Sequence, residues 1–233
     1  MSSLRLDIWS DIACPWCYVG KRRLEAALAR FEHASDVVIH WRAFELDPGA
    51  PRVRDRRQSY AERLAAKYRT RPAEAEAMIA RMTQVAAAEG LDFRFDLAQA
   101  GNTFDAHRLL HLAHVRDRQD ALKERLLRAY FTEGKAIGDP DVLHALAVEA
   151  GLDSAEVRAV LDSDRHADDV RADEAEAREL GITGVPFFVL DGRLGVSGAQ
   201  PADVLLGALE RAWRDRGPSI IADGAVCGPD GCA

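Results

Sequence analysis

Alternating and helical hydrophobic patterns divide the first part of the chain into three elements. Apolar and polar residues alternate from Leu4 to Ser10, which predicts a strand. Apolar residues then recur at helical spacing from Tyr18 to Phe31, with charged residues on the other face, which predicts an amphipathic helix. A second β-rich run, Val37 to Leu46, ends at the turn signal Asp47-Pro48-Gly49. The chain therefore begins with a strand, a helix and a second strand.

The rest of the chain is helical in character until β-type patterns return near its end. From about Arg54 to Leu180 it is rich in Ala, Glu, Arg and Leu, and glycine and proline breaks divide it into about six segments without a fixed repeat. Pro186 to Leu190 is a short apolar β run. Asp191-Gly192 is a hairpin signal that allows Leu194 to Val196 to pair with this run, and a final helix is expected from Ala202 to Arg214.

These elements predict an α/β fold in which a strand-helix-strand half and a strand-strand-helix half flank a large all-helical insertion. We expect residues 1–48 and 181–216 to form one discontinuous domain and residues 49–180 to form the helical insertion domain. Residues 217–233, rich in Gly, Pro and Asp, are expected to form a C-terminal tail.

Composition narrows the classes of partner. The formal net charge is -7, and the only dense basic run, residues 52–57, has no interleaved aromatic residues, which disfavours a nucleic-acid partner. No stretch approaches the roughly 20 consecutive apolar residues that a membrane-spanning helix needs. The N-terminus passes directly into the first predicted strand without a signal-peptide pattern, so we expect a cytoplasmic location.

The four cysteines form two close pairs, Cys14 with Cys17 and Cys227 with Cys232. In a protein that is expected in the cytoplasm, such pairs indicate redox chemistry or metal binding rather than a disulfide framework. Neither pair is needed to staple a chain of this length, because it can bury a sizeable core.

The first pair lies in the motif Cys14-Pro15-Trp16-Cys17, between a predicted strand and a predicted helix. A thiol attacks a disulfide only as the thiolate, and the positive end of a helix favours that form. With Cys14 as N-cap and Pro15 as first helical residue, Cys14 faces unpaired amides, while Cys17 lies one turn further and better shielded. We therefore expect Cys14 to attack and Cys17 to resolve the mixed disulfide. A zinc half-site is the structural alternative, which the strand-to-helix context disfavours.

A second signal, Gly184-Val185-Pro186-Phe187, stands at the head of the first strand after the insertion. Proline is tolerated at the start of a strand because it has no ladder donor to lose. Alone, Pro186 is a strand-leading proline. It becomes informative together with the Cys14 motif on the other side of the insertion.

The order of these motifs resembles the DsbA family of the thioredoxin superfamily, and its FrnE-like branch more closely. The stretches that carry the resemblance are Asp11 to Lys21, Phe44 to Pro48, Asn102 to Leu109 and Gly181 to Phe188. The resemblance implies a thioredoxin-like fold, with the nucleophile at Cys14 and the resolving cysteine at Cys17. It further implies a cis proline at Pro186 that packs against the motif, and a backbone at Val185 that pairs with substrate, with Pro15 and Trp16 beside it.

The resemblance also implies activity without a bound cofactor, through a redox-active disulfide that acts on protein thiols or disulfides. Glutathione or a thioredoxin-type protein is the implied electron donor. Strongly oxidising DsbA members carry a histidine inside the motif where this chain has Trp16, so its disulfide should be less oxidising. A cytosolic reductase or isomerase is therefore favoured over a net oxidant.

The second pair, in Cys227-Gly-Pro-Asp-Gly-Cys232, lies outside the resemblance to the wider family. A tail of about 10 extended residues spans roughly 33 Å, enough to approach the Cys14 region. An auxiliary dithiol that exchanges electrons with that centre and a local disulfide that closes a turn are both open. Metal binding by the thiolates is a third, less favoured interpretation.

A few polar residues are secondary candidates for the site. Asp11 and Glu45 could accept or relay a proton, although a solvated strand end is the commoner setting for such residues. Asn102 begins the third resembling stretch. His107 lies among leucines and fits a helix histidine better than a ligand. His111 and His114 have no acidic partner at matching spacing, and no metal site is predicted. The run Lys21 to Arg23 is expected on a solvated helix face.

Two other classes of function remain open from the sequence. A related branch uses glutathione to transfer or isomerise small aromatic molecules, but it usually has a serine at the position of Cys14 and no resolving cysteine. A binding protein, a holdase or a metal-sequestering module that uses its thiols, is the alternative outside enzymes. Turnover of a disulfide substrate that is lost on Cys14→Ser separates the enzyme from the binder.

Overall fold

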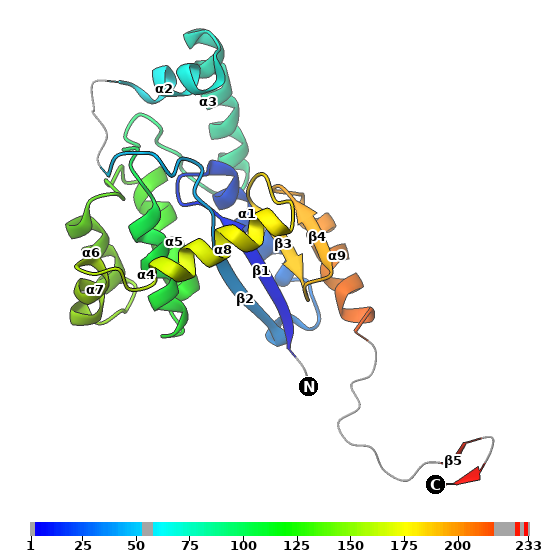
Figure 1. Cartoon of the computed structure of the whole chain (residues 1–233). Helices are drawn as coiled ribbons and strands as arrows, with labels where there is room; N and C mark the ends of the chain where they lie inside the picture. Colours follow the sequence, from blue (N-terminus) through cyan, green and yellow to red (C-terminus); the bar gives the residue numbers. More distant parts are fainter. Residues whose placement is uncertain (1–2, 53–57, 217–226, 229–230, 233) are drawn as a thin grey trace.

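The computed structural model describes residues 3–52, 58–216, 227–228 and 231–232 (Figure 1). Its central sheet has the strand order β2-β1-β3-β4. Strands β1 and β2 pair in parallel, whereas β1 with β3 and β3 with β4 are antiparallel. The strands are β1 (Leu4–Ser10), β2 (Val37–Ala43), β3 (Phe187–Leu190) and β4 (Leu194–Ser197).

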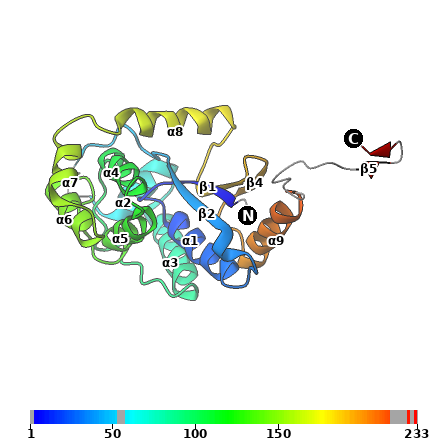
Figure 2. The same ribbon diagram turned by 90° about the horizontal axis from the view of Figure 1, so that it is seen from below.

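Helices cover both faces of the sheet (Figure 2). Helices α1 (Pro15–Leu28) and α9 (Ala202–Arg214) pack together on one face, over a core that includes Leu6, Ile8 and Phe188. Helix α8 (Ala167–Glu179) covers the other face, where Trp9, Ala177, Ile182 and Val189 form a smaller cluster. The short 3-10 helix η1 (Ala34–Asp36) precedes β2. The predicted α/β, thioredoxin-like architecture with a helical insertion is confirmed.

The insertion shares one hydrophobic core with the start of α1. Ile12, Tyr18 and Val19 belong to the same buried cluster as the apolar faces of the inserted helices. These helices are α2 (Tyr60–Tyr68), α3 (Pro72–Ala88), α4 (Phe104–His114), α5 (Gln119–Phe131), α6 (Pro140–Glu149) and α7 (Ser154–Leu161). The division of the chain into domains at residues 48 and 181 stays a prediction, and α8, which falls in the predicted insertion, packs on the sheet.

Element boundaries differ from the sequence prediction where the break is not glycine or proline. The chain turns at Asp117 and at His166, both with a left-handed backbone (φ of 54° and 62°), and so separates α4 from α5 and α7 from α8. Residues 91–101 form no helix. Strand β2 ends at Ala43, three residues before the predicted end, because the chain there leaves the sheet. None of the helices in the described part of the chain is long and apolar enough to span a membrane.

Candidate active site

Cys14 and Cys17 lie at the junction between β1 and α1. Cys14 is the N-cap, with an extended backbone, and Pro15 is the first helical residue, as predicted from the motif. Proline fits this position because its missing N–H is one that a helix start leaves unpaired. Cys14 is 4% exposed and Cys17 1%. Cys17 is therefore the better shielded of the two sulfurs.

The Val185-Pro186 loop meets this helix start. The thiol of Cys14 donates a hydrogen bond to the Val185 carbonyl at 3.5 Å, and the Val185-Pro186 peptide bond is cis. Gly20 allows the close approach of α1, since a Cβ there would lie 3.0 Å from the Pro186 ring. The fold thus brings together motifs that are 171 residues apart in the chain.

A groove of about 940 Å³ opens at Cys14. Cys14, Pro15, Trp16 and Val185 form one of its edges, and Cys17 does not line it. Trp16 is 44% exposed and presents an apolar surface beside the thiol. The opposite wall comes from α2 and α3 of the insertion, with apolar side chains and three basic residues, and includes Leu64, Met78, Met82, Arg63, Lys67 and Arg81. Access to this groove distinguishes Cys14 from Cys17.

The two thiols are electrostatically coupled. Their mutual hydrogen bond, burial and the Asp11 carboxylate raise the pKa of Cys14 well above its usual range. Burial also opposes ionisation of Cys17, but the hydrogen bond from Cys14 and the charge of Lys123 outweigh it and lower the pKa of Cys17. One negative charge on the pair is therefore favoured and a second is opposed. The sequence argument, which considered only the helix end at Cys14, did not include this coupling.

Lys123 was missed by the sequence analysis. It lies on α5, is 0% exposed, and donates to the carbonyl of Ser10 at 3.4 Å. The available signal was its position in the helix, because Lys123 shares the buried face with Leu122, Leu126 and Leu127. A lysine on such a face is uncommon unless it has a charged partner.

Asp11 is also buried, which corrects the expectation of a solvated strand end. Its carboxylate accepts a hydrogen bond from the Leu46 N–H at 2.8 Å, and the His107 ring lies 3.4 Å away. Burial raises the pKa of Asp11, but His107 and the Leu46 N–H outweigh it and hold the pKa below its usual value. His107, 1% exposed on α4, therefore faces a carboxylate close to the cysteines.

Glu45 and Asn102 contact each other but do not line the groove. The Asn102 amide donates to Glu45 at 3.3 Å, and Glu45 forms an ion pair of 2.8 Å with Arg171. Glu45 is 7% exposed, so the expected solvated strand end is wrong here too. Burial raises the pKa of Glu45, against the opposing effect of Arg171. These two candidates join the end of the second strand to the insertion instead of reaching the thiols.

The Lys21 to Arg23 run is not a solvated face. Lys21 is 3% exposed and lies within ion-pair distance of Glu25, Asp120 and Glu124, at 2.5, 3.2 and 3.2 Å. Two of these carboxylates belong to α5, so the motif helix is fastened to the insertion by charge as well as by apolar contacts. Sequence reasoning could not find this pairing, because Lys21 and Glu124 are far apart in the chain.

Cys227 and Cys232 face each other in the register of a two-residue ladder between β5 (Cys227–Gly228) and β6 (Gly231–Cys232). The predicted connection, residues 217–226, and residues 229–230 of the motif lie outside the described residues. The auxiliary role of this pair stays a prediction. In the described part of the chain, no group of three or more His, Cys, Asp or Glu side chains is placed to hold a metal ion.

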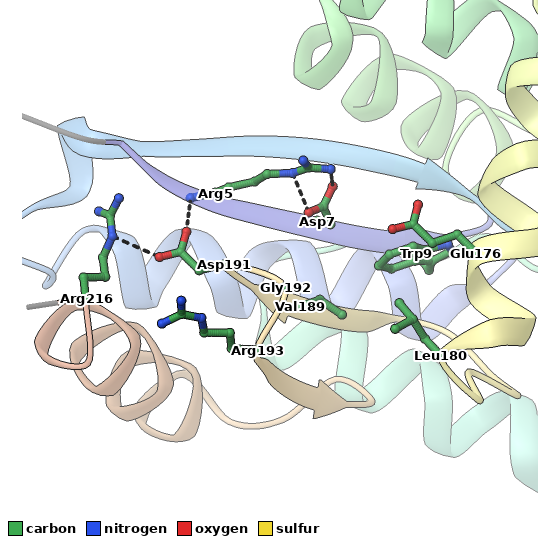
Figure 3. Close-up of a pocket in the computed structure, with 10 residues that line it drawn as sticks. All are labelled: Arg5, Asp7, Trp9, Glu176, Leu180, Val189, Asp191, Gly192, Arg193 and Arg216. Atoms are coloured by element: carbon green, nitrogen blue, oxygen red, sulfur yellow. Dashed lines mark hydrogen bonds and ion pairs between the residues drawn. The ribbon is translucent and has the colours of Figure 1, made fainter.

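A second cavity, of about 520 Å³, runs along β1 from Arg5 to Trp9, between the β3–β4 turn and α8 (Figure 3). Asp191 accepts a hydrogen bond from the Arg5 N–H at 2.9 Å and pairs with Arg216 at 2.9 Å. Arg5 also pairs with the buried Asp7 at 2.7 Å. These contacts tie the β3–β4 turn and the end of α9 to β1, which gives this cavity a structural role apart from the thiols.

A cysteine pair at a helix start, facing a cis proline on a four-stranded sheet, defines a thioredoxin-like protein with a dithiol centre. Residues 5–210 match the DSBA-like thioredoxin domain, and the chain belongs to that family. It has the fold of DsbA-like thiol–disulfide oxidoreductases, a family of redox enzymes.

Individual relatives agree with this assignment. The chain is 52% identical to a probable DsbA oxidoreductase from Streptomyces coelicolor, with a TM-score of 0.87 over 99% of this chain and 98% of that one. It is 28% identical over 204 residues to the uncharacterized protein YwbO of Bacillus subtilis, which covers 87% of this chain and 94% of the relative. The cytosolic disulfide reductase DsbM from Pseudomonas aeruginosa, solved with GSH, shares the fold at 21% identity and a TM-score of 0.61, over 90% and 99% of the two chains.

Proposed function

We propose that the protein exchanges electrons with protein thiols and disulfides through Cys14 and Cys17. The observation that carries this proposal is the position of the Cys14 sulfur, at the start of α1, at the edge of the groove, and 3.5 Å from the Val185 carbonyl. A substrate cysteine in the groove reaches Cys14 before Cys17. Cys14 is therefore the nucleophile and Cys17 the resolving cysteine.

The reaction conserves atoms and electrons in two exchanges. The Cys14 proton passes to Cys17 along their mutual hydrogen bond, and the Cys14 thiolate then attacks one sulfur of a substrate disulfide, forms a mixed disulfide, and releases the other substrate sulfur as a thiolate. Cys17, as thiolate, then attacks the Cys14 sulfur, so that the Cys14–Cys17 disulfide forms and the second substrate thiolate leaves. Two electrons pass to the substrate, and its thiolates take up the two protons that the cysteine pair gives up.

The groove suits a segment of polypeptide. Its volume lies within the range that holds drug-sized ligands, and its walls are largely apolar. In the proposed complex, an extended substrate segment lies along Val185 and pairs with its backbone, while Pro15 and Trp16 contact the residues beside the substrate cysteine. Asp11 lines the groove beside Cys14 as a charged neighbour of the thiols.

Reduction or isomerisation is the proposed direction. Trp16 carries no charge to stabilise a thiolate, so the reduced form gains less than it would from a histidine. We propose a cytoplasmic location and glutathione or a thioredoxin-type protein as the electron donor. The fold that DsbM shares with this chain, in a structure that holds GSH, supports glutathione as the first donor to test.

We propose that Cys227 and Cys232 act as an auxiliary dithiol. Cys227 and Cys232 are partners in the backbone register of β5 and β6, and in the proposed relay a disulfide between them exchanges with the Cys14 thiolate. The double variant Cys227→Ser, Cys232→Ser tests this. Loss of turnover with an intact Cys14–Cys17 disulfide supports the relay, whereas unchanged turnover excludes it.

Insulin reduction in dithiothreitol tests the main proposal. Wild type is compared with Cys14→Ser and with Cys17→Ser, and the fraction of oxidised pair is measured across glutathione buffers. We expect catalysis that Cys14→Ser abolishes, and a mixed disulfide with glutathione that accumulates on Cys17→Ser. A potential nearer that of thioredoxin, about -270 mV, than that of DsbA, about -120 mV, supports the reductive direction. No catalysis by wild type overturns the proposal.

A further inference from the structure

Lys123 is a buried cation whose positive charge is only partly balanced by the groups in contact with it. Its ammonium donates to the Ser10 carbonyl at 3.4 Å and lies 5.4 Å from the centre of the Trp41 ring. In the described part of the chain Lys123 forms no ion pair with a carboxylate, and Asp11 acts on it at longer range. A buried ammonium costs several kcal/mol unless charges of opposite sign surround it. The fold must therefore supply a counter-charge to Lys123.

The groups that can supply this charge belong to the redox site. Ser10, to which Lys123 donates, directly precedes Asp11 and the turn that carries Cys14. Burial lowers the pKa of Lys123 to about 8, while negative charge on Cys17, Asp11 and Cys14 opposes that fall, in that order. Among these negative groups, the resolving cysteine therefore has the largest effect on the pKa of Lys123.

The same attraction appears from the side of the thiols. Lys123 lowers the pKa of Cys17, and the hydroxyl of Ser10 contributes in the same direction. Two other charged groups face Lys123 from neighbouring elements. The positive charge of Lys21 on α1 lowers the pKa of Lys123, and the charge of Lys123 lowers the pKa of His107 on α4. The ionisation of the cysteine pair is therefore favoured by the ammonium of Lys123 and opposed by the carboxylate of Asp11.

Lys21 provides the contrast within the same structure. It is buried like Lys123, but three carboxylates already surround it. The charge of Lys21 is therefore compensated by carboxylates in every redox state, whereas Lys123 has the Asp11 charge in every state and the thiolate charge in the reduced state alone.

We propose that Lys123 is a positioning residue of the dithiol, whose ammonium is the counter-charge of the thiolate in the reduced centre. The helical insertion then sets the redox potential of Cys14 and Cys17 as well as the wall of the groove. This inference rests on the dithiol chemistry of the proposed function. When Cys17 attacks Cys14, the S–S bond forms, two electrons leave with the substrate, and the thiolate charge beside Lys123 disappears. The ammonium therefore favours the reduced state.

The test compares Lys123→Met with Lys21→Met, a matched variant that removes the other buried lysine. An opposite charge at close range shifts a pKa by about 1–3 units. We expect Lys123→Met to raise the pKa of the thiol pair, which is measured from the absorbance of the thiolate as the pH is varied. We also expect it to shift the equilibrium with glutathione about tenfold toward the disulfide, or about 30 mV. Lys21→Met should shift this equilibrium less than about twofold, and Lys123→Arg should restore the wild-type value.

Other outcomes overturn the inference in distinguishable ways. A wild type without a redox-active Cys14–Cys17 pair overturns both this inference and the proposed function. If the wild type has a redox-active Cys14–Cys17 pair but Lys123→Met leaves the thiol pKa and the equilibrium with glutathione unchanged, this inference alone is overturned. A measurement on the wild type remains decisive where Lys123→Met does not fold. NMR titration of lysine labelled at Cε should show a lower pKa for Lys123 in the oxidised than in the reduced protein, and equal values overturn the inference.

Discussion

Asp173 on α8 joins four parts of the fold, and its removal tests how the sheet is held. One carboxylate oxygen accepts a hydrogen bond from the Ala43 N–H at 2.8 Å and lies 2.9 Å from the His111 ring. The other accepts from Arg42 at 2.8 Å. Its backbone carbonyl accepts from the Trp9 indole at 2.9 Å. Asp173 thus connects α8 to β1, β2 and α4 with a side chain that is 2% exposed.

The cost of Asp173→Ala follows from the groups left behind. The Ala43 N–H is buried and loses its side-chain acceptor, which costs about 1–3 kcal/mol. Arg42 loses a charged hydrogen bond, but it is partly exposed and keeps Asp7 at 2.8 Å, so its loss is smaller than for a fully buried pair. The Trp9 bond uses the backbone and survives. We expect the free energy of unfolding to fall by about 3 kcal/mol at pH 7.

Urea unfolding, followed by tryptophan fluorescence, measures this loss. Glu176→Gln is the matched control, because Glu176 lies on the same helix and 3.9 Å from Arg42, but is 45% exposed. It should cost less than about 1 kcal/mol. A loss below about 1 kcal/mol for Asp173→Ala would refute the reasoning.

The pH dependence gives a second check on Asp173. Burial raises its pKa, but His111, the Ala43 N–H and Arg42 outweigh burial and lower it. The folded pKa therefore lies below the unfolded one, so the stabilisation is complete above about pH 4 and is lost as the pH falls further. The difference between wild type and Asp173→Ala should narrow below pH 4. A constant difference from pH 7 to pH 3 contradicts the assignment.

Three further variants test the site and its support. Gly20→Ala places a Cβ 3.0 Å from the Pro186 ring, and the overpacking should exceed the gain in helix propensity, lowering the unfolding free energy by about 1 kcal/mol in urea; an increase contradicts the close approach. Trp16→His should shift the equilibrium with glutathione about tenfold toward the dithiol, mostly below about pH 6.5; no shift would show that this position does not control the potential. Burial raises the pKa of Glu124, but Arg22 outweighs it and the pKa falls to about 2. Its stabilisation is therefore complete above pH 4.5 and lost toward pH 2, and Glu124→Gln should flatten that part of the thermal-stability profile.

Local signals in the sequence predicted the frame of the molecule. The alternation from Leu4 to Ser10, the Asp191-Gly192 turn and the final helix Ala202 to Arg214 all agree with the structure, because each depends on neighbouring residues. The cap at Cys14 was predictable for the same reason. Breaks at Asp117 were not, since aspartate adopts a left-handed backbone only where its surroundings favour it.

The charged part of the site was predicted less well than the cysteines. Asp11 was a candidate and does lie beside the thiols, but Glu45 was assigned to the same group and instead pairs with Arg171. A carboxylate that ends a strand gives no sign of what will cover it. Lys123 was missed because its partners lie 113 residues away and come together only when α5 packs under the turn after β1.

The two halves of the site depend on different parts of the chain. The thioredoxin-like elements fix the geometry, since Cys14, Cys17 and the Val185 carbonyl are placed by β1, α1 and the head of β3. The insertion adds the groove wall and the buried charge of Lys123. Substitutions on α5 can therefore change the potential without moving the sulfurs, and substitutions on α2 or α3 can change substrate choice without changing the potential. Redox potential and specificity should then vary independently among variants of the insertion, which a single shared determinant at the motif would not allow.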